Sequence, residues 1–157
     1  MENFNLNSEK TPTLAETISW ATYLHLGQKD KAGEDYILHP LRMKDSVRLL
    51  TEEEMIMAVL HDTIEDCGVT EGALIARGYG DDIIIGLNYL SKLPEEENDY
   101  EAFIERVCSG PVSVRRVKLA DLDDNSDLNR FKNPTPSDYK RTRKYLKAIK
   151  KIEATFI

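Results

Sequence analysis

The stretch Thr51–Asp66, TEEEMIMAVLHDTIED, decides the fold class of this chain. Thr51 and Glu54 form a T-x-x-E pattern, which is a sequence signature of a helix N-terminus. The residues that follow are mostly apolar until they reach His61 and Asp62. We therefore predict a helix that begins after Thr51, runs on to Asp62 and is largely buried.

Helix signals recur on both sides of this stretch, whereas strand signals are scarce. The segment 81–93 has the content of a buried strand, but its flanking carboxylates and its length favour a helix. A polar loop is expected over residues 28–36, and Val47 and Leu50 are expected on the apolar side of the helix that begins at His39. The other predicted helices cover about residues 12–24, 70–78, 99–108, 111–128 and 136–154.

These patterns predict an all-α fold, a helical bundle of about seven to eight helices. At 157 residues the chain fits one domain, which we place over residues 1–157, with a core over 12–154 and a flexible N-terminus over 1–10. The net charge of −7 disfavours binding to nucleic acid. No stretch is apolar enough for a membrane span, and Cys67 and Cys108 form no CxxC pair, so we expect a soluble cytoplasmic protein.

The end of the Thr51–Asp66 stretch gathers groups that can hold a metal ion. His61 and Asp62 follow an apolar run, and burying a carboxylate costs several kcal/mol unless a partner compensates. Glu65 and Asp66 lie four residues further on, so the spacing predicts that they share a helix face with the first pair. An HD dipeptide alone is usually an ordinary surface or core feature, but four such groups in one apolar helix indicate a metal ion or bound water, and a divalent cation is one way to compensate the buried charge.

Two further residues stand in suggestive positions. His39 begins a helix directly after the 28–36 loop, and Asp121 follows an apolar run with Asn125 one turn beyond it. Taken alone, His39 could equally be a surface histidine at a helix end. Three nearby carboxylates are expected to be solvated and without a role: Asp123, Asp124 and Asp127.

Three motifs together resemble the hydrolase domain of the RelA/SpoT family, and more closely the single-domain small alarmone hydrolases. They are GQKDKAGEDYILHP at Gly27–Pro40, HDTIED at His61–Asp66 and KLADLDDN at Lys118–Asn125. The resemblance covers about residues 14–128 and is specific, since HDT-x-ED is accompanied by both flanking segments. It implies an HD-type helical bundle.

The resemblance also implies roles for individual residues. A single divalent cation, typically Mn²⁺, would be held by His39, His61, Asp62 and Asp121. Glu65 and Asp66 would orient and deprotonate the attacking water, Lys31 would contact substrate phosphate and Asn125 the nucleoside. The implied reaction removes the 3′-pyrophosphate of (p)ppGpp and yields GDP or GTP.

The chain departs from the family pattern where the base is recognised. Asp30 stands where the family has a base-stacking arginine, Leu122 stands where arginine is usual, and Leu128 replaces a polar residue. An aspartate cannot stack as a guanidinium does, and it repels phosphate. An adenosine alarmone, (p)ppApp, or another 3′-phosphorylated nucleotide is therefore an alternative substrate to the guanosine alarmone.

Two other functions compete with this interpretation: an HD-type nucleotidase, and a non-catalytic module that senses a nucleotide or partner. The expected ligand is a small nucleotide. Two further partners are considered: an alarmone synthetase whose product this protein would remove, and a second copy of this chain in a homo-oligomer. The basic C-terminal helix is interpreted as a solvated face over an apolar stripe. The alternative is that one or two of its cations reach the substrate pyrophosphate or an acidic partner.

Overall fold

The computed structural model describes residues 11–157, so the predicted flexible segment 1–10 lies outside the described residues. The chain folds into α-helices joined by short connections. In chain order these are α1 (Leu14–Leu24), α2 (Leu38–Lys44), α3 (Glu52–Leu60), α4 (Thr63–Cys67), α5 (Glu71–Ala76), α6 (Asp81–Leu90), α7 (Tyr100–Ser109), α8 (Val112–Ser126) and α9 (Pro136–Glu153). Short 3₁₀ turns are formed by Pro94–Glu96, Leu128–Arg130 and Ala154–Phe156.

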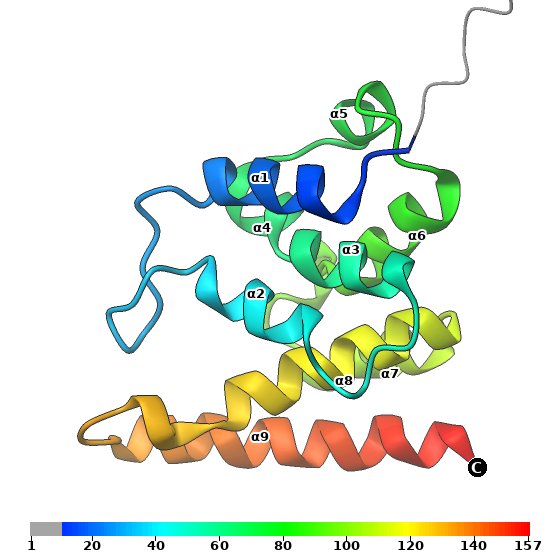
Figure 1. The fold of residues 1–157 in the computed structure, drawn as a ribbon. Helices are drawn as coiled ribbons and strands as arrows, with labels where there is room; N and C mark the ends of the chain where they lie inside the picture. Colours follow the sequence, from blue (N-terminus) through cyan, green and yellow to red (C-terminus); the bar gives the residue numbers. More distant parts are fainter. Residues whose placement is uncertain (1–10) are drawn as a thin grey trace, which may run out of the picture.

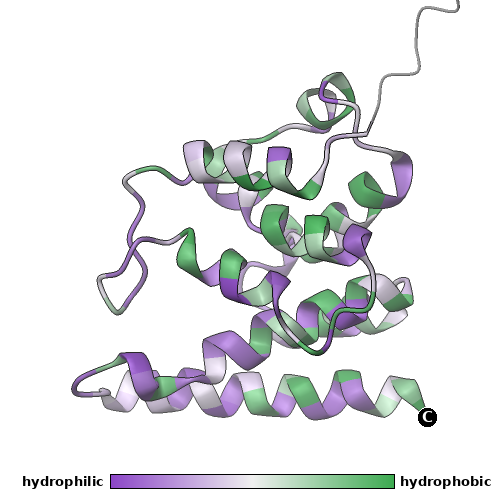
Figure 2. Ribbon diagram, in the orientation of Figure 1, coloured by the Kyte–Doolittle hydropathy of each residue, from purple (hydrophilic) through white to green (hydrophobic). Residues whose placement is uncertain are grey.

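Helix α3 lies at the centre of the bundle. It packs against α1, α2, α6 and α8. The long helix α9 lies along α8 and α7, on the side of the molecule away from α1 (Figure 1). Figure 2 shows α3 and α6 as largely hydrophobic, whereas hydrophilic and hydrophobic residues alternate along α9. The buried apolar side chains form one continuous cluster, as expected for a helical bundle.

The predicted all-α fold is confirmed. Within residues 11–157 the chain forms no β-strand, and an isolated bridge joins Lys29 to Asp35 in the 28–36 loop. The segment 81–93, which could have been a strand, forms α6. Gly86 of α6 faces α3 so closely that a Cβ atom there would collide with Met57, which explains a glycine inside this helix. Among the described residues, no helix combines the length and apolar character that crossing a bilayer requires.

Two predicted helices are wrong in their extent. Helix α2 ends at Lys44, and Val47 and Leu50 are exposed rather than on an apolar face. The Ser46 hydroxyl accepts a hydrogen bond from the backbone N–H of Arg48 in this connection, a local bond that competes with helix. The helix predicted to continue from Thr51 to Asp62 instead ends at Leu60.

The interruption after α3 positions the site. His61 and Asp62 form a turn between α3 and α4, and α4 ends at Cys67. The next residue, Gly68, caps the helix with a φ of 66°, the left-handed conformation that glycine adopts readily. Thr51 caps α3 by accepting a hydrogen bond from the Glu54 backbone N–H, as the sequence predicts. The turn places His61 against the start of α2 and the middle of α8.

Candidate metal centre

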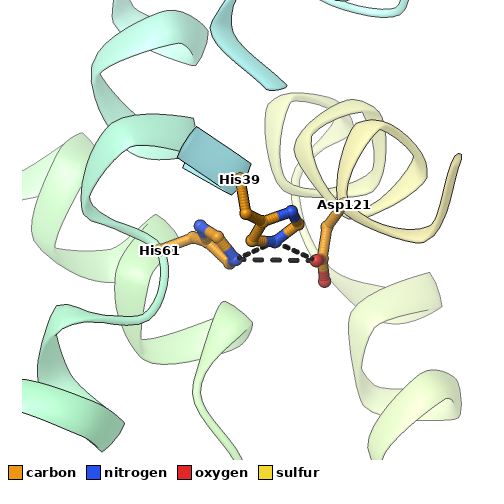
Figure 3. Close-up of side chains that lie close together, drawn as sticks. All are labelled: His39, His61 and Asp121. Atoms are coloured by element: carbon orange, nitrogen blue, oxygen red, sulfur yellow. Dashed lines mark hydrogen bonds and ion pairs between the residues drawn. The ribbon is translucent and has the colours of Figure 1, made fainter. Parts of the chain in front are cut away.

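His39, His61 and Asp121 meet in the interior of the protein, although they come from three separate elements (Figure 3). His39 lies in the first turn of α2, His61 follows α3, and Asp121 lies in α8. His39 Nε2 is 3.3 Å from His61 Nε2 and 3.0 Å from the Asp121 Oδ1 atom. His61 Nε2 is 3.5 Å from the same Asp121 oxygen. All three side chains are buried.

The opposite nitrogen of each imidazole is already engaged. His61 Nδ1 lies 2.8 Å from the Ala58 carbonyl oxygen, and His39 Nδ1 lies 2.6 Å from Asp124 Oδ2. A carbonyl or carboxylate oxygen only accepts, so each Nδ1 carries the hydrogen and each neutral ring presents an Nε2 lone pair to the centre. Two nitrogen lone pairs and a carboxylate oxygen therefore face one another, an arrangement that a metal cation or protons on the histidines would stabilise.

Asp62 adds a second carboxylate to this centre. Its Oδ2 atom is 2.9 Å from His61 Nε2, and the Tyr36 hydroxyl donates a hydrogen bond to the same oxygen. The Asp62 side chain is partly buried, at 22% exposure. We call His39, His61, Asp62 and Asp121 the ligand cluster. Imidazole nitrogens and carboxylate oxygens suit Mn²⁺, Fe²⁺ and Zn²⁺, so the donor set fits a divalent cation.

The Asp121 carboxylate is held by two further donors from its own helix. Lys118 Nζ donates to Oδ2 at 2.7 Å, and Asn125 Nδ2 donates to Oδ1 at 2.8 Å. Lys118 is itself buried, and its amine lies 4.8 Å from the centre of the Phe103 ring. Asn125, to which the family resemblance gives a role in nucleoside binding, thus donates to Asp121 and also lines the adjacent cavity.

The charges of the ligand cluster shift one another's pKa values. Burial lowers the pKa of His61, but the charge of Asp62 and the hydrogen bond to Asp121 outweigh it, so the pKa lies well above the ordinary value. The pKa of His39 is also raised, since hydrogen bonds to Asp121 and Asp124 outweigh its burial. Burial raises the pKa of Asp62, yet the charge of His61 dominates and lowers it to about 2. Without a metal, protons on the histidines would therefore supply the missing positive charge.

Asp124 contradicts the expectation that it is merely solvated. Its carboxylate, only 13% exposed, accepts from His39 Nδ1 and forms a two-point ion pair with Arg42. Burial raises the pKa of Asp124, but the hydrogen bonds from His39 and Arg42 lower it to about 2. Asp123 is more exposed and pairs with Arg48, while Asp127 caps the 3₁₀ turn that follows α8.

Glu65 and Asp66, the predicted water-activating pair, are exposed residues of α4. Glu65 accepts a hydrogen bond from the Lys92 backbone N–H, so its carboxylate reaches the turn after α6. Asp66 accepts from Gln28 Nε2 at 3.1 Å, which ties α4 to the 28–36 loop. The predicted shared face with His61 and Asp62 is only partly realised, because the turn at His61–Asp62 sends the first pair inward.

A cavity of about 300 Å³ adjoins the ligand cluster. Tyr36 and Asn125 line it beside the cluster, and its basic residues include Lys31, Arg130 and Arg141. Burial and the charge of Arg141 lower the pKa of Lys31. Lys144 does not line this cavity but shows the same pattern, since its pKa is lowered by burial and then by four cationic neighbours, namely Lys92, Lys31, Arg141 and Lys118. Crowded cations of this kind favour an anionic ligand.

Comparisons with known proteins identify the relatives of this chain. No family model matches it. It is 33% identical to a GTP pyrophosphokinase of Myxococcus xanthus over 119 residues, which make up 68% of this chain and 16% of that protein. It is 32% identical to a guanosine-3′,5′-bis(diphosphate) 3′-pyrophosphohydrolase of Vibrio cholerae over 133 residues, or 76% of this chain and 18% of that protein. The chain thus spans less than a fifth of the length of these relatives.

Its fold is similar to that of a metazoan SpoT ortholog described as hydrolysing ppGpp, with a TM-score of 0.75. The match covers 93% of this chain and 85% of that one at 18% identity. The chain belongs to the RelA/SpoT family of HD-domain proteins. The resemblance stated from the three sequence motifs is therefore confirmed, together with the helical HD fold.

The structure gives local reasons for the departures from the RelA/SpoT pattern. Asp30 Oδ1 accepts hydrogen bonds from the backbone N–H groups of Ala32 and Glu34, so this carboxylate closes the tight turn of the loop. Leu122 is fully buried and belongs to the hydrophobic core. Leu128 lines the cavity, where it contributes an apolar surface.

The sequence interpretation missed several residues that support the ligand cluster: Tyr36, Arg42, Lys118 and Asp124. One signal was available for two of them. Lys118 and Asp124 each lie three residues from Asp121, and residues at this spacing share a helix face. No local signal identifies Tyr36 or Arg42, because their partners lie 26 and 82 residues away in the sequence.

Proposed function

We propose that this chain is a metal-dependent phosphohydrolase that removes the 3′-pyrophosphate from a guanosine or adenosine alarmone such as (p)ppGpp. The observation that carries the proposal is the convergence of two imidazole lone pairs and the Asp121 carboxylate on one point, with both Nδ1 atoms engaged elsewhere. The names of the relatives, which include 3′-pyrophosphohydrolases, support the choice of reaction.

The ligand cluster would hold one divalent cation, with Mn²⁺ as the proposed native metal. When bound, such a cation supplies Lewis acidity and lowers the pKa of a coordinated water. Hydrogen bonds already orient two of the cluster's carboxylates, since Lys118 and Asn125 donate to Asp121, and Tyr36 donates to Asp62. Little reorganisation is then needed when the cation enters.

Glu65 and Asp66 are proposed to orient the attacking water and take its proton. In the reaction, the water oxygen bonds to the phosphorus attached to the ribose 3′ oxygen, the bond between that phosphorus and the 3′ oxygen breaks, and the 3′ oxygen gains a proton. Both carboxylates are exposed, which leaves them accessible to water and substrate. Gln28 and the Lys92 backbone hold them through one hydrogen bond each.

The cavity beside the cluster is the proposed nucleotide site. Lys31 is proposed to contact substrate phosphate, and Arg141 of the basic C-terminal helix faces the same cavity. Lys147 and Lys151 of that helix belong to its solvated face, since they form exposed ion pairs with Glu101 and Glu105. Arg141 is the basic residue of α9 among those that line the cavity, where it forms an ion pair with Asp138.

We also propose a reducing compartment, the cytoplasm, because Cys67 and Cys108 are free thiols. The proposed partner is a small nucleotide, and nucleic acid and membranes are not proposed as ligands. A separate alarmone synthetase would be a functional counterpart rather than a bound partner.

One panel assay tests the function. Purified protein with Mn²⁺ is given ppGpp, ppApp and deoxynucleoside monophosphates, and pyrophosphate and phosphate release are measured for the natural chain and for Glu65→Gln. Pyrophosphate release from an alarmone that collapses in Glu65→Gln supports the proposal. Release of phosphate from monophosphates alone would favour a nucleotidase, and tight binding of an alarmone without turnover would favour a sensor.

A further inference from the structure

Asp124 occupies a position that its sequence neighbours do not share. Its Oδ2 atom lies 2.6 Å from His39 Nδ1, and its Oδ1 atom accepts from Arg42 Nε at 2.8 Å. Arg42 Nη2 reaches Oδ2 at 3.0 Å, so the guanidinium holds the carboxylate at two points. Arg130 approaches the same carboxylate from the cavity side at 3.5 Å. Every contact is cationic or hydrogen-donating.

We infer that Asp124 is a positioning residue: it holds His39 in the tautomer and orientation that direct Nε2 into the ligand cluster, and Arg42 fixes Asp124 in turn. The inference rests on the proposed function, because it assigns a role toward the cation that the cluster would hold. A carboxylate that accepts from the second nitrogen of a ligating histidine orients the ring and makes it a better ligand.

The two histidines of the cluster depend on different kinds of support. His61 Nδ1 donates to a backbone oxygen, that of Ala58, which no substitution removes. His39 Nδ1 donates to a side chain, so its support can be tested by mutation. Without Asp124, the His39 ring loses the partner that distinguishes its two nitrogens, and Nε2 would be protonated in part of the molecules.

Asp123 provides a matched control in the same helix. It carries the same charge one residue away, but its side chain is 41% exposed and pairs with Arg48 at 2.8 Å. No contact joins it to the ligand cluster among the described residues. A general effect of lost negative charge in this part of α8 should appear at both positions, whereas the loss of the hydrogen bond to His39 Nδ1 belongs to Asp124 alone.

The experiment measures Mn²⁺ affinity by calorimetry for the natural chain, Asp124→Asn and Asp123→Asn. Asp124→Asn should bind Mn²⁺ roughly 10–100-fold more weakly, the usual cost of losing such a support, while Asp123→Asn should match the natural chain. Thermal unfolding of the metal-free proteins checks that each variant is folded. Arg42→Met keeps Asp124 but removes its clamp, so it should show a smaller loss of affinity.

The double variant Arg42→Met/Asp124→Asn should bind no more weakly than Asp124→Asn, because Arg42 acts through Asp124. If Asp124→Asn does not fold, the Arg42→Met measurement decides, and unchanged Mn²⁺ affinity there would overturn the inference. Equal affinities for Asp124→Asn and Asp123→Asn would also overturn it while leaving the proposed function intact. If the natural chain binds no Mn²⁺, both the inference and the proposed function are overturned.

Discussion

The buried and exposed parts of the site are built differently. His39, His61 and Asp121 of the ligand cluster have at most 4% of their surface exposed, whereas Lys31, Glu65 and Asp66, which we call the rim, are exposed. Every buried member has two or more polar partners, while Glu65 and Asp66 are each held by one hydrogen bond.

This contrast follows from the cost of burial. A charge removed from water must be paired or it destabilises the fold, so the cluster is assembled as part of the core with its supports in place. The rim keeps its hydration and is free to adjust to a substrate. Substitutions in the cluster should therefore affect both stability and chemistry, and substitutions in the rim should affect chemistry alone.

The largest effect is expected from Asp121→Asn. The change removes a ligand and leaves the buried Lys118 amine without its counter-charge, so metal-free stability should fall by about 3–5 kcal/mol and hydrolysis should become undetectable. Denaturant unfolding and the pyrophosphate assay measure the two effects. The double variant Lys118→Met/Asp121→Asn should regain most of the stability but no activity; recovery of activity would place Asp121 outside the metal centre.

Glu65→Gln is the corresponding test of the rim. Loss of a general base should lower kcat by roughly 10²–10⁴-fold. Because Glu65 is exposed, Mn²⁺ affinity and the midpoint of thermal unfolding should stay at the values of the natural chain. A variant that loses stability as well would show that the rim is not independent of the core.

Metal and pH together test the charge balance of the ligand cluster. The raised pKa values of His39 and His61 contribute stability that is complete below their unfolded pKa, about 6.5, and is lost as pH rises through the folded pKa. The lowered pKa values of Asp62 and Asp124, about 2 each, contribute stability above an unfolded pKa of about 3.9 that is lost as pH falls toward 2. The metal-free protein should be most stable at mildly acidic pH.

Mn²⁺ should offset the loss on the alkaline side, because it replaces the protons that the histidines release. At a free concentration of 100 times Kd the stabilisation should be about 2.7 kcal/mol, and it should shrink as pH falls and protons compete. Thermal unfolding from pH 4 to 9, with Mn²⁺ or with a chelator, measures both trends. Stabilisation by Mn²⁺ that grows at lower pH would contradict binding at the histidines.

The smallest effect is expected from Lys31→Met. A phosphate contact made equally in the ground state and the transition state contributes to binding, so KM should rise by roughly 10-fold while kcat changes little. Stability should not change, since the side chain is exposed. Steady-state kinetics with the alarmone substrate measures the two constants, and a fall in kcat of the same size as the rise in KM would assign Lys31 a role in the chemical step.

Much of the fold follows from local sequence signals. The cap at Thr51 marks a helix start that the structure reproduces, and the helix predicted over residues 136–154 is found as α9. The same reasoning extended α2 through Val47 and Leu50, where Ser46 instead forms a local turn. Periodicity indicates which face of a helix is apolar, but it does not show where the chain prefers a turn to one more helical residue.

The motifs HP, HDT-x-ED and KLAD-xxx-N were enough, on the sequence alone, to indicate a helical HD protein with ligands drawn from separate helices. Only the tertiary structure distinguished Asp124 from Asp123 and turned His61 and Asp62 away from Glu65 and Asp66. The physical reason is that helix propensity and periodicity act over a few residues. A side chain's partner, by contrast, is decided by packing between segments that are distant in the sequence, such as His39 and Asp124, which are 85 residues apart.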